Sequence, residues 1–139
     1  MRYVLLTYNA PDAREAWDAM TPTERRAEEN EYVQLVEAMR HSNSYVAAVE
    51  FDPSATTHTV RVGNGTVSVT GGPATTAEES LTGYFVIEVD SIESAIDWAS
   101  KIPNARNGSV EVRKADESEL ADRIARAASE AAPQRSSPG

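Results

Sequence analysis

The chain has 139 residues, of which 40% are hydrophobic, and it carries a formal net charge of −9 at pH 7. This length suits one domain with its own core. The excess of carboxylates disfavours binding to nucleic acid and to anionic membrane surfaces, since both require a basic patch. The sequence has no cysteine, which excludes disulfides, thiolate metal sites and cysteine nucleophiles. No apolar stretch reaches the length of a bilayer span and no secretory leader is recognisable, so we expect a cytoplasmic protein.

The first third of the chain predicts a strand, two helices and a second strand. Residues 2–8 place apolar side chains on both sides, as in an interior strand, and a short helix over 13–20 follows. Residues 21–24, Thr-Pro-Thr-Glu, combine a capping side chain, proline at the first helical position and a carboxylate at the third. They therefore predict the start of a longer helix. Residues 45–51 follow it as a second strand.

A β-hairpin is predicted around residues 63–65, Gly-Asn-Gly. Valine alternates with polar residues on both sides of this turn, so each arm has one apolar face. Asparagine and glycine tolerate the positive φ angles of tight hairpin turns. Residues 71–73, Gly-Gly-Pro, cannot continue a strand, because proline lacks an N–H and glycine is costly to order. A loop must follow the hairpin.

The second half of the domain predicts a central strand, a helix and an edge strand. Residues 84–89 are almost all β-branched or aromatic, which favours a strand buried on both faces. Asp90 and Glu93 have the spacing of a helix capping box, and Pro103 ends the apolar stripe that follows. After a polar connection, residues 108–113 alternate and predict the last strand.

These elements divide the chain into a domain over 1–114, an amphipathic helix over 115–132 and a tail over 133–139. The tail is rich in proline, serine and glycine, so we expect it to be disordered. Without the hairpin, the order of elements is βαββαβ, which predicts an α+β, ferredoxin-like fold with both helices on one face of an antiparallel sheet. The other face stays open. We therefore expect a homodimer in which two open sheet faces pack together.

Several segments between residues 1 and 114 resemble the YCII-related family, and more narrowly its DGPF-domain branch. The segments are the N-terminal Met-Arg-Tyr-Val-Leu-Leu-Thr-Tyr, Ala55-Thr56-Thr57 before Val60-Arg61-Val62, the Gly-Gly-Pro loop, Gly83-Tyr84, Trp98-Ala99, Ile102-Pro103 and residues 108–113. The resemblance implies a dimeric α+β barrel. It also implies a frequent association with extracytoplasmic-function sigma factors and a superfamily that includes muconolactone-type isomerases and dehalogenases. Most members of the DGPF branch have no established activity.

The chain departs from the family pattern at two places that carry chemistry. Where the branch name expects Asp-Gly-Pro-Phe, residues 71–74 read Gly-Gly-Pro-Ala, so the carboxylate and the aromatic ring are both missing. Members of the family that are thought to be catalytic pair a histidine of the first helix with an aspartate. No histidine lies between Thr21 and Arg40. A His/Asp acid–base site therefore cannot be carried over to this chain.

The remaining candidate for acid–base chemistry is His58 with Glu50. A histidine beside a carboxylate can act as a general base near neutral pH, whereas the alternative is an ordinary half-exposed strand histidine. A ligand pocket is expected near the loop after the hairpin, where glycine amides would bind an anion and aromatic rings would line the cavity or belong to the core. Its residues are Gly71, Gly72, Pro73, Tyr84 and Tyr8. The sequence shows no metal-ligand spacing and no cofactor motif, so neither a metal nor a cofactor is expected.

Two functions remain open. The first is a non-catalytic dimeric module that binds a small molecule or a protein partner in a regulatory setting. The second is a cofactor-independent enzyme, an isomerase, lyase or dehalogenase-like protein, that acts on a small organic substrate through His58 or Glu50. We favour the first, because the loop at residues 71–74 has lost two functional side chains of its motif.

Overall fold

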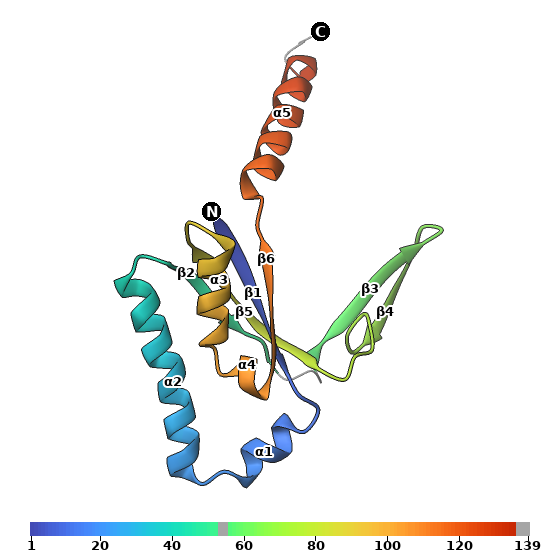
Figure 1. Cartoon of the computed structure of the whole chain (residues 1–139). Coiled ribbons are helices and arrows are strands. Elements are labelled where there is room, and N and C mark those ends of the chain that lie inside the picture. The colour runs from blue at the N-terminus through green and yellow to red at the C-terminus, as the bar shows by residue number, and fades with distance from the viewer. Residues whose placement is uncertain (53–55, 136–139) are drawn as a thin grey trace.

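The computed structural model describes residues 1–52 and 56–135 of the chain (Figure 1). The elements are β1 (Arg2–Asn9), α1 (Ala13–Ala19), α2 (Pro22–His41), β2 (Tyr45–Glu50), β3 (His58–Gly63), β4 (Thr66–Gly71), β5 (Ser80–Glu88), α3 (Ile92–Ser100), α4 (Asn104–Asn107), β6 (Gly108–Lys114) and α5 (Glu117–Arg135). The predicted α+β class is confirmed. Within these described ranges, no helix is both long enough and apolar enough to span a membrane.

The main sheet has four strands in the order β2-β5-β1-β6, and each neighbouring pair is antiparallel. β1 and β5 lie in the middle, as their apolar sequences predict. Across them, Tyr3 lies opposite Ile87 and Leu5 lies opposite Phe85. Opposed residues of an antiparallel pair share a face, so these four side chains form one apolar layer.

The core lies between this layer and the helices α2 and α3. Leu5, Ile87 and Met39 are fully buried, and α3 adds Ala95 and Ala99. On the other face of the sheet, the side chains at alternate positions of β1 and β5 are only partly buried. The prediction that residues 84–89 are buried on both faces is therefore wrong for this chain, because α2 and α3 cover one face only.

Two helix starts can be compared with their predicted caps. At α2, the Thr21 hydroxyl accepts a hydrogen bond from the Glu24 amide (3.2 Å), and the Glu24 carboxylate accepts one from the Thr21 amide (3.1 Å). The predicted capping box is confirmed. At α3, the cap is Ser91, whose hydroxyl accepts from the Ser94 amide, so the predicted start at Asp90 lies one residue too early. A serine hydroxyl satisfies the free amides of a first turn as well as a carboxylate does.

The predicted hairpin forms a separate ribbon, β3–β4, which projects away from the main sheet (Figure 1). Its turn residues Asn64 and Gly65 have φ angles of 51° and 75°. Two consecutive positive φ angles are typical of a type I′ turn, whose twist matches that of the flanking strands. Val60 therefore faces Val69, and Val62 faces Val67.

The C-terminal part differs from its prediction in two ways. Residues 104–107, expected as a polar connection, form the short helix α4. The helix α5 runs from Glu117 to Arg135 and so extends into the segment expected as a tail, while residues 136–139 lie outside the described part of the chain. α5 follows β6 and projects from the end of the sheet (Figure 1), and Leu120 and Ile124 on it are exposed.

Candidate functional site

The base of the ribbon brings together four of the predicted site residues, His58, Gly71, Gly72 and Pro73. His58 is the first residue of β3 and lies opposite Gly71 in β4. Gly72, at a φ of 95°, donates its amide to the carbonyl of Thr57 (2.8 Å), and its own carbonyl accepts from the Thr59 hydroxyl (2.8 Å). Because the Gly72 amide is already paired within the chain, it is not available to bind an anion in this conformation. Pro73 follows at the surface.

His58 and Glu50 are both exposed, and no hydrogen bond or ion pair joins these two described residues. The His58 Nδ1 atom lies 3.1 Å from the carbonyl oxygen of Thr56. Glu50 ends β2 and lies opposite Gly83 of β5. Residues 53–55, between the two side chains in the sequence, are outside the described part. The pairing of His58 with Glu50 as an acid–base couple stays a prediction.

Tyr8 and Tyr84 lie on the face of the sheet that α2 and α3 leave open. Tyr84 is opposite Leu6 on one side and Val49 on the other. The ring of Phe51 lies 5.9 Å from that of Tyr84, at an interplanar angle of 59°. We call this surface the open face; its side chains include Val4, Leu6, Tyr8, Ala47, Val49, Phe51, Leu81, Tyr84, Val86, Ser109, Glu111 and Arg113.

The β6 border of the open face is charged. Register places Ser109 opposite Tyr8 and Glu111 opposite Leu6. The Arg113 Nε atom donates to the Glu111 carboxylate at 2.6 Å, and this hydrogen bond raises the pKa of Arg113 further above its ordinary value. The open face is therefore apolar along β1, β5 and β2 and carries an exposed ion pair at one edge.

A polar cluster that the sequence did not predict joins α2, α4 and β1. Tyr32 donates its hydroxyl hydrogen to the Asn104 side-chain oxygen at 2.6 Å, and the Asn104 amide donates to the side-chain oxygen of Asn9 at 2.7 Å. Asn104 is only 6% exposed. Burial raises the pKa of Tyr32 from 10.0 to about 12, and nearby carboxylates, first Glu28 and then Glu50, add to the effect. Since each polar group has a partner, the cluster holds the helices on the sheet.

No local signal marks this cluster in the sequence. Asn9 ends a strand and Asn104 follows Pro103, and both positions read as ordinary polar turn residues. Only the fold brings together two asparagines that are 95 residues apart. The cluster is well satisfied and holds the protonated form of Tyr32, so its arrangement suits a structural role.

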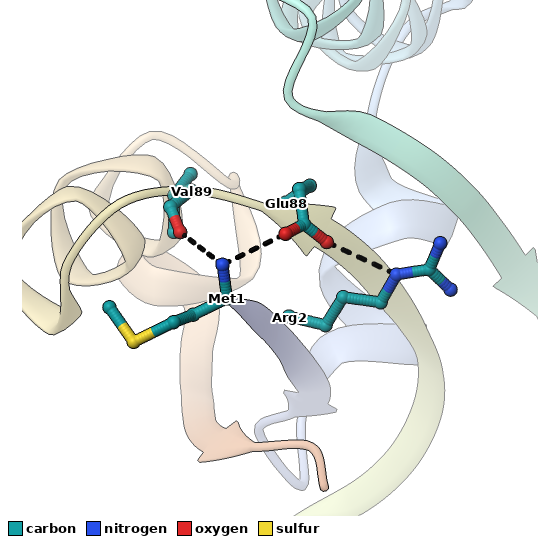
Figure 2. A network of polar contacts seen from close by, with 4 residues as sticks. All are labelled: Met1, Arg2, Glu88 and Val89. Carbon is teal, nitrogen blue, oxygen red and sulfur yellow. Dashed lines mark hydrogen bonds and ion pairs between the residues drawn. The ribbon is translucent and has the colours of Figure 1, made fainter. Parts of the chain in front are cut away.

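A second polar network fixes the opposite end of the sheet (Figure 2). The N-terminal amine of Met1 donates to the Glu88 carboxylate at 2.8 Å and to the Val89 carbonyl at 2.9 Å, and Arg2 donates to the other carboxylate oxygen of Glu88 at 3.1 Å. The hydrogen bond from the amine is the main cause that lowers the pKa of Glu88 below its ordinary value. These contacts tie the start of β1 to the end of β5.

Two shallow grooves lie on the helical side of the molecule. One, of about 350 Å³, follows α2, and the other, of about 400 Å³, lies between α3 and the turn after α2. Their lining residues are Tyr32, Val33, Val36, Glu37 and Arg40 for the first, and Ser42, Asn43, Ser44, Glu88, Val89, Asp90, Ser94 and Trp98 for the second. Neither groove includes a predicted pocket residue. The structure thus divides those residues between the ribbon base and the open face.

Comparison with known proteins relates the chain to a family and to a relative. The family model of the YCII-related domain matches residues 1–118. An uncharacterized protein of Rhizobium meliloti (strain 1021) is 31% identical over 121 residues, which cover 81% of this chain and 90% of that protein.

Proposed function

The chain belongs to the YCII-related domain family, and on that premise we propose that it is a non-catalytic, homodimeric binding module. In this proposal, two ferredoxin-like protomers pack through their open faces into an α+β barrel. The module then binds a small molecule or a protein partner in a regulatory setting in the cytoplasm. The observation that carries the proposal is the apolar open face.

The arrangement of the sheet supports the ferredoxin-like part of the proposal. When the ribbon is set aside, the strand order β2-β5-β1-β6 places the first and third strands in the middle and the second and fourth at the edges. The core residues of α2 and α3 lie on the same side of this sheet. A βαββαβ chain with two helices on one face has this arrangement.

The composition of the open face supports the dimer. Val4 lies opposite Val86, and Leu6 lies opposite Tyr84, so apolar pairs run across the two central strands. Val49 and Phe51 extend this surface at β2 with 41% and 44% of their area exposed. Contiguous apolar surface on a small domain marks an interaction site. Two such faces related by a twofold axis would bury each other.

The ligand proposal rests on the same surface. Between two packed sheets, the tilted rings of Tyr84 and Phe51 would line an apolar space, and the Tyr8 hydroxyl and the Glu111–Arg113 pair would border it. Such a space suits a small, partly apolar molecule with a polar group at one end. Specificity would then come from the few polar groups at the β6 edge.

The dimer is tested by placing a charge on the open face. Val49→Glu should weaken the dimer by about tenfold or more, because a buried carboxylate without a partner is costly. Val33→Glu is the matched control, since Val33 is 53% exposed on α2, away from the open face. Sedimentation equilibrium measures both dissociation constants. A monomeric wild-type protein would contradict the dimer, and equal effects of the two substitutions would contradict its placement at the open face.

The non-catalytic part needs a separate experiment. Purified protein should convert no substrate in a broad screen of small organic acids, lactones and halides. Substrate conversion that His58→Ala or Glu50→Gln abolishes would overturn this part and favour the enzyme hypothesis.

A further inference from the structure

The β3–β4 ribbon carries an apolar face that the rest of the described chain does not cover. Val60, Val62, Val67 and Val69 are 61%, 66%, 61% and 58% exposed. The register places them in two directly opposed pairs, so all four project from the same face of the ribbon. We call this surface the valine face.

The opposite face of the ribbon is polar and is held by its own chain. Arg61 donates to the carbonyl of Ala74 at 3.0 Å, and Ser68 donates to the Arg61 carbonyl at 3.3 Å. The ribbon thus has one face fixed to the following loop and one apolar face in solvent. An isolated two-stranded hairpin is marginal in water, so a ribbon of this kind gains stability when its apolar face is covered.

We infer that the valine face of each copy packs against a second copy of this chain, beside its open face. This inference rests on the proposed dimer. Every contact in a twofold dimer occurs twice, so in this arrangement each of the two ribbons would contact the other protomer. The ribbon would act as an arm that reaches from one protomer to its partner.

Charge favours a second copy as the occupant. Residues 58–71 contain no carboxylate, and Arg61 is their one formal charge with histidine taken as neutral. The chain carries −9 in total, so the rest of it carries −9 − 1 = −10. The valine face itself is uncharged, because Arg61 lies on the opposite face and donates to the Ala74 carbonyl, so this face can approach a second, acidic copy without repulsion between carboxylates. The same acidic surroundings disfavour a nucleic acid or an anionic membrane as the occupant.

The limited size of the open face also favours an additional contact between the ribbon and a second copy. A stable interface uses about 20 to 30 residues and about 800 Å² on each side. The open face supplies only the alternate residues of four short strands, part of which are polar or charged. The valine face adds a second apolar surface to the same contact. The contact would therefore be larger than one made by the open face alone.

Two adjacent residues of β4 give a matched test. Val69 belongs to the valine face, whereas Thr70 points to the polar face, opposite Thr59. Val69→Glu should raise the dissociation constant of the dimer about tenfold or more. Thr70→Glu adds the same charge to the same strand and should stay within about twofold of the wild type. Sedimentation equilibrium measures both, and equal effects of the two substitutions would overturn the inference.

A second variant distinguishes loss of the contact between copies from unfolding of the ribbon. Val60→Thr with Val69→Thr keeps the β-branched shape that strands favour, but it makes the face polar. It should weaken the dimer about fivefold or more, with unchanged circular dichroism. If this variant dimerises like the wild type while Val49→Glu does not dimerise, the ribbon inference fails and the dimer stands. A monomeric wild-type protein overturns both.

The contact between copies can be observed directly. The chain has no cysteine, so Thr70→Cys provides a single attachment point for a nitroxide label. Mixed with nitrogen-15-labelled wild-type protein, the labelled copy should broaden amide signals of β1, β5 or β2 in the other copy. A label at Val33→Cys on α2 is the control and should leave these signals sharp. Unchanged signals with the Thr70→Cys label would overturn the inference.

Discussion

The β1–β5 pair and the β3–β4 pair each have an apolar face, but the two faces have different surroundings. Both pairs are antiparallel; β1 and β5 carry apolar residues on both faces, whereas β3 and β4 carry valines on one face only. In the first pair, Leu5 and Ile87 are 0% exposed, whereas in the second, Val62 is 66% exposed. The difference is that α2 and α3 cover the first pair. Alternation therefore specifies which face of a strand is apolar, and it does not specify whether that face is buried.

The helices α3 and α5 repeat this contrast. Both are amphipathic in sequence, yet Ala95 and Ala99 of α3 are buried while Leu120 and Ile124 of α5 are 54% and 60% exposed. α3 begins three residues after Val89, a core residue that directly follows β5, and the short connection returns it over the sheet. α5 follows an edge strand and continues beyond it (Figure 1). Both connections are short, so the direction in which each helix leaves its strand decides which apolar stripe is buried.

The largest expected effect comes from truncating one side chain in each strand pair. Ile87→Ala should lower the free energy of unfolding by about 2 to 5 kcal/mol, because it removes methylene groups from a closed core and leaves a cavity. Val62→Ala should cost only about 0.5 kcal/mol in a monomer. Urea unfolding followed by circular dichroism measures both, in the Val49→Glu background so that association does not contribute. Equal losses would show that the ribbon is buried within its own chain.

Two glycines extend the comparison to the backbone. A Cβ atom at Gly83 would collide with the Val49 carbonyl oxygen, whereas at Gly63 it would meet nothing within 4 Å. Gly83→Ala should therefore push β2 away from β5 and lower the free energy of unfolding by about 1 to 3 kcal/mol. Gly63→Ala in the ribbon should be neutral or slightly stabilising. Thermal unfolding compares the two, and a neutral Gly83→Ala would mean that β2 is free to shift.

The smallest expected effect concerns the hydroxyl that joins α2 to the end of the sheet. Tyr32→Phe removes its hydrogen bond to Asn104 and should lower the free energy of unfolding by about 1 kcal/mol at neutral pH. The pKa of Tyr32 is raised in the folded state, from 10.0 to about 12, so the folded protein favours neutral tyrosine. This contribution is fully present below pH 10 and is lost as the pH rises through about 12.

The measurement is the difference in unfolding free energy between the wild type and Tyr32→Phe as a function of pH. The difference should be constant up to about pH 10 and shrink above it. Absorbance titration of the wild type should show one late tyrosine step that the variant lacks. A difference that grows above pH 10 would contradict the assigned direction of the pKa shift.

Local signals predicted most elements of the fold. The Thr21–Glu24 box and the Asn64–Gly65 turn were identified correctly because capping and hairpin geometry depend on a few adjacent residues. The start of α3 and the short helix α4 were not identified correctly. Serine and asparagine occur both at helix caps and in loops, so these residues alone do not distinguish the two. The candidate site was the least predictable part. Its residues come from strands, a ribbon and loops that are distant in sequence, and their separation into two regions follows from strand pairing.

The sequence by itself determined the α+β class, the interior position of β1 and β5, the hairpin with its valine face and the absence of thiol chemistry. These properties depend on composition and on patterns within a few residues. Only the tertiary structure decided which apolar faces are buried, that Tyr32 reaches Asn104, and that the Gly72 amide is paired within the ribbon base. Burial and pairing depend on which distant segments meet, and that is decided by the packing of whole elements on the sheet.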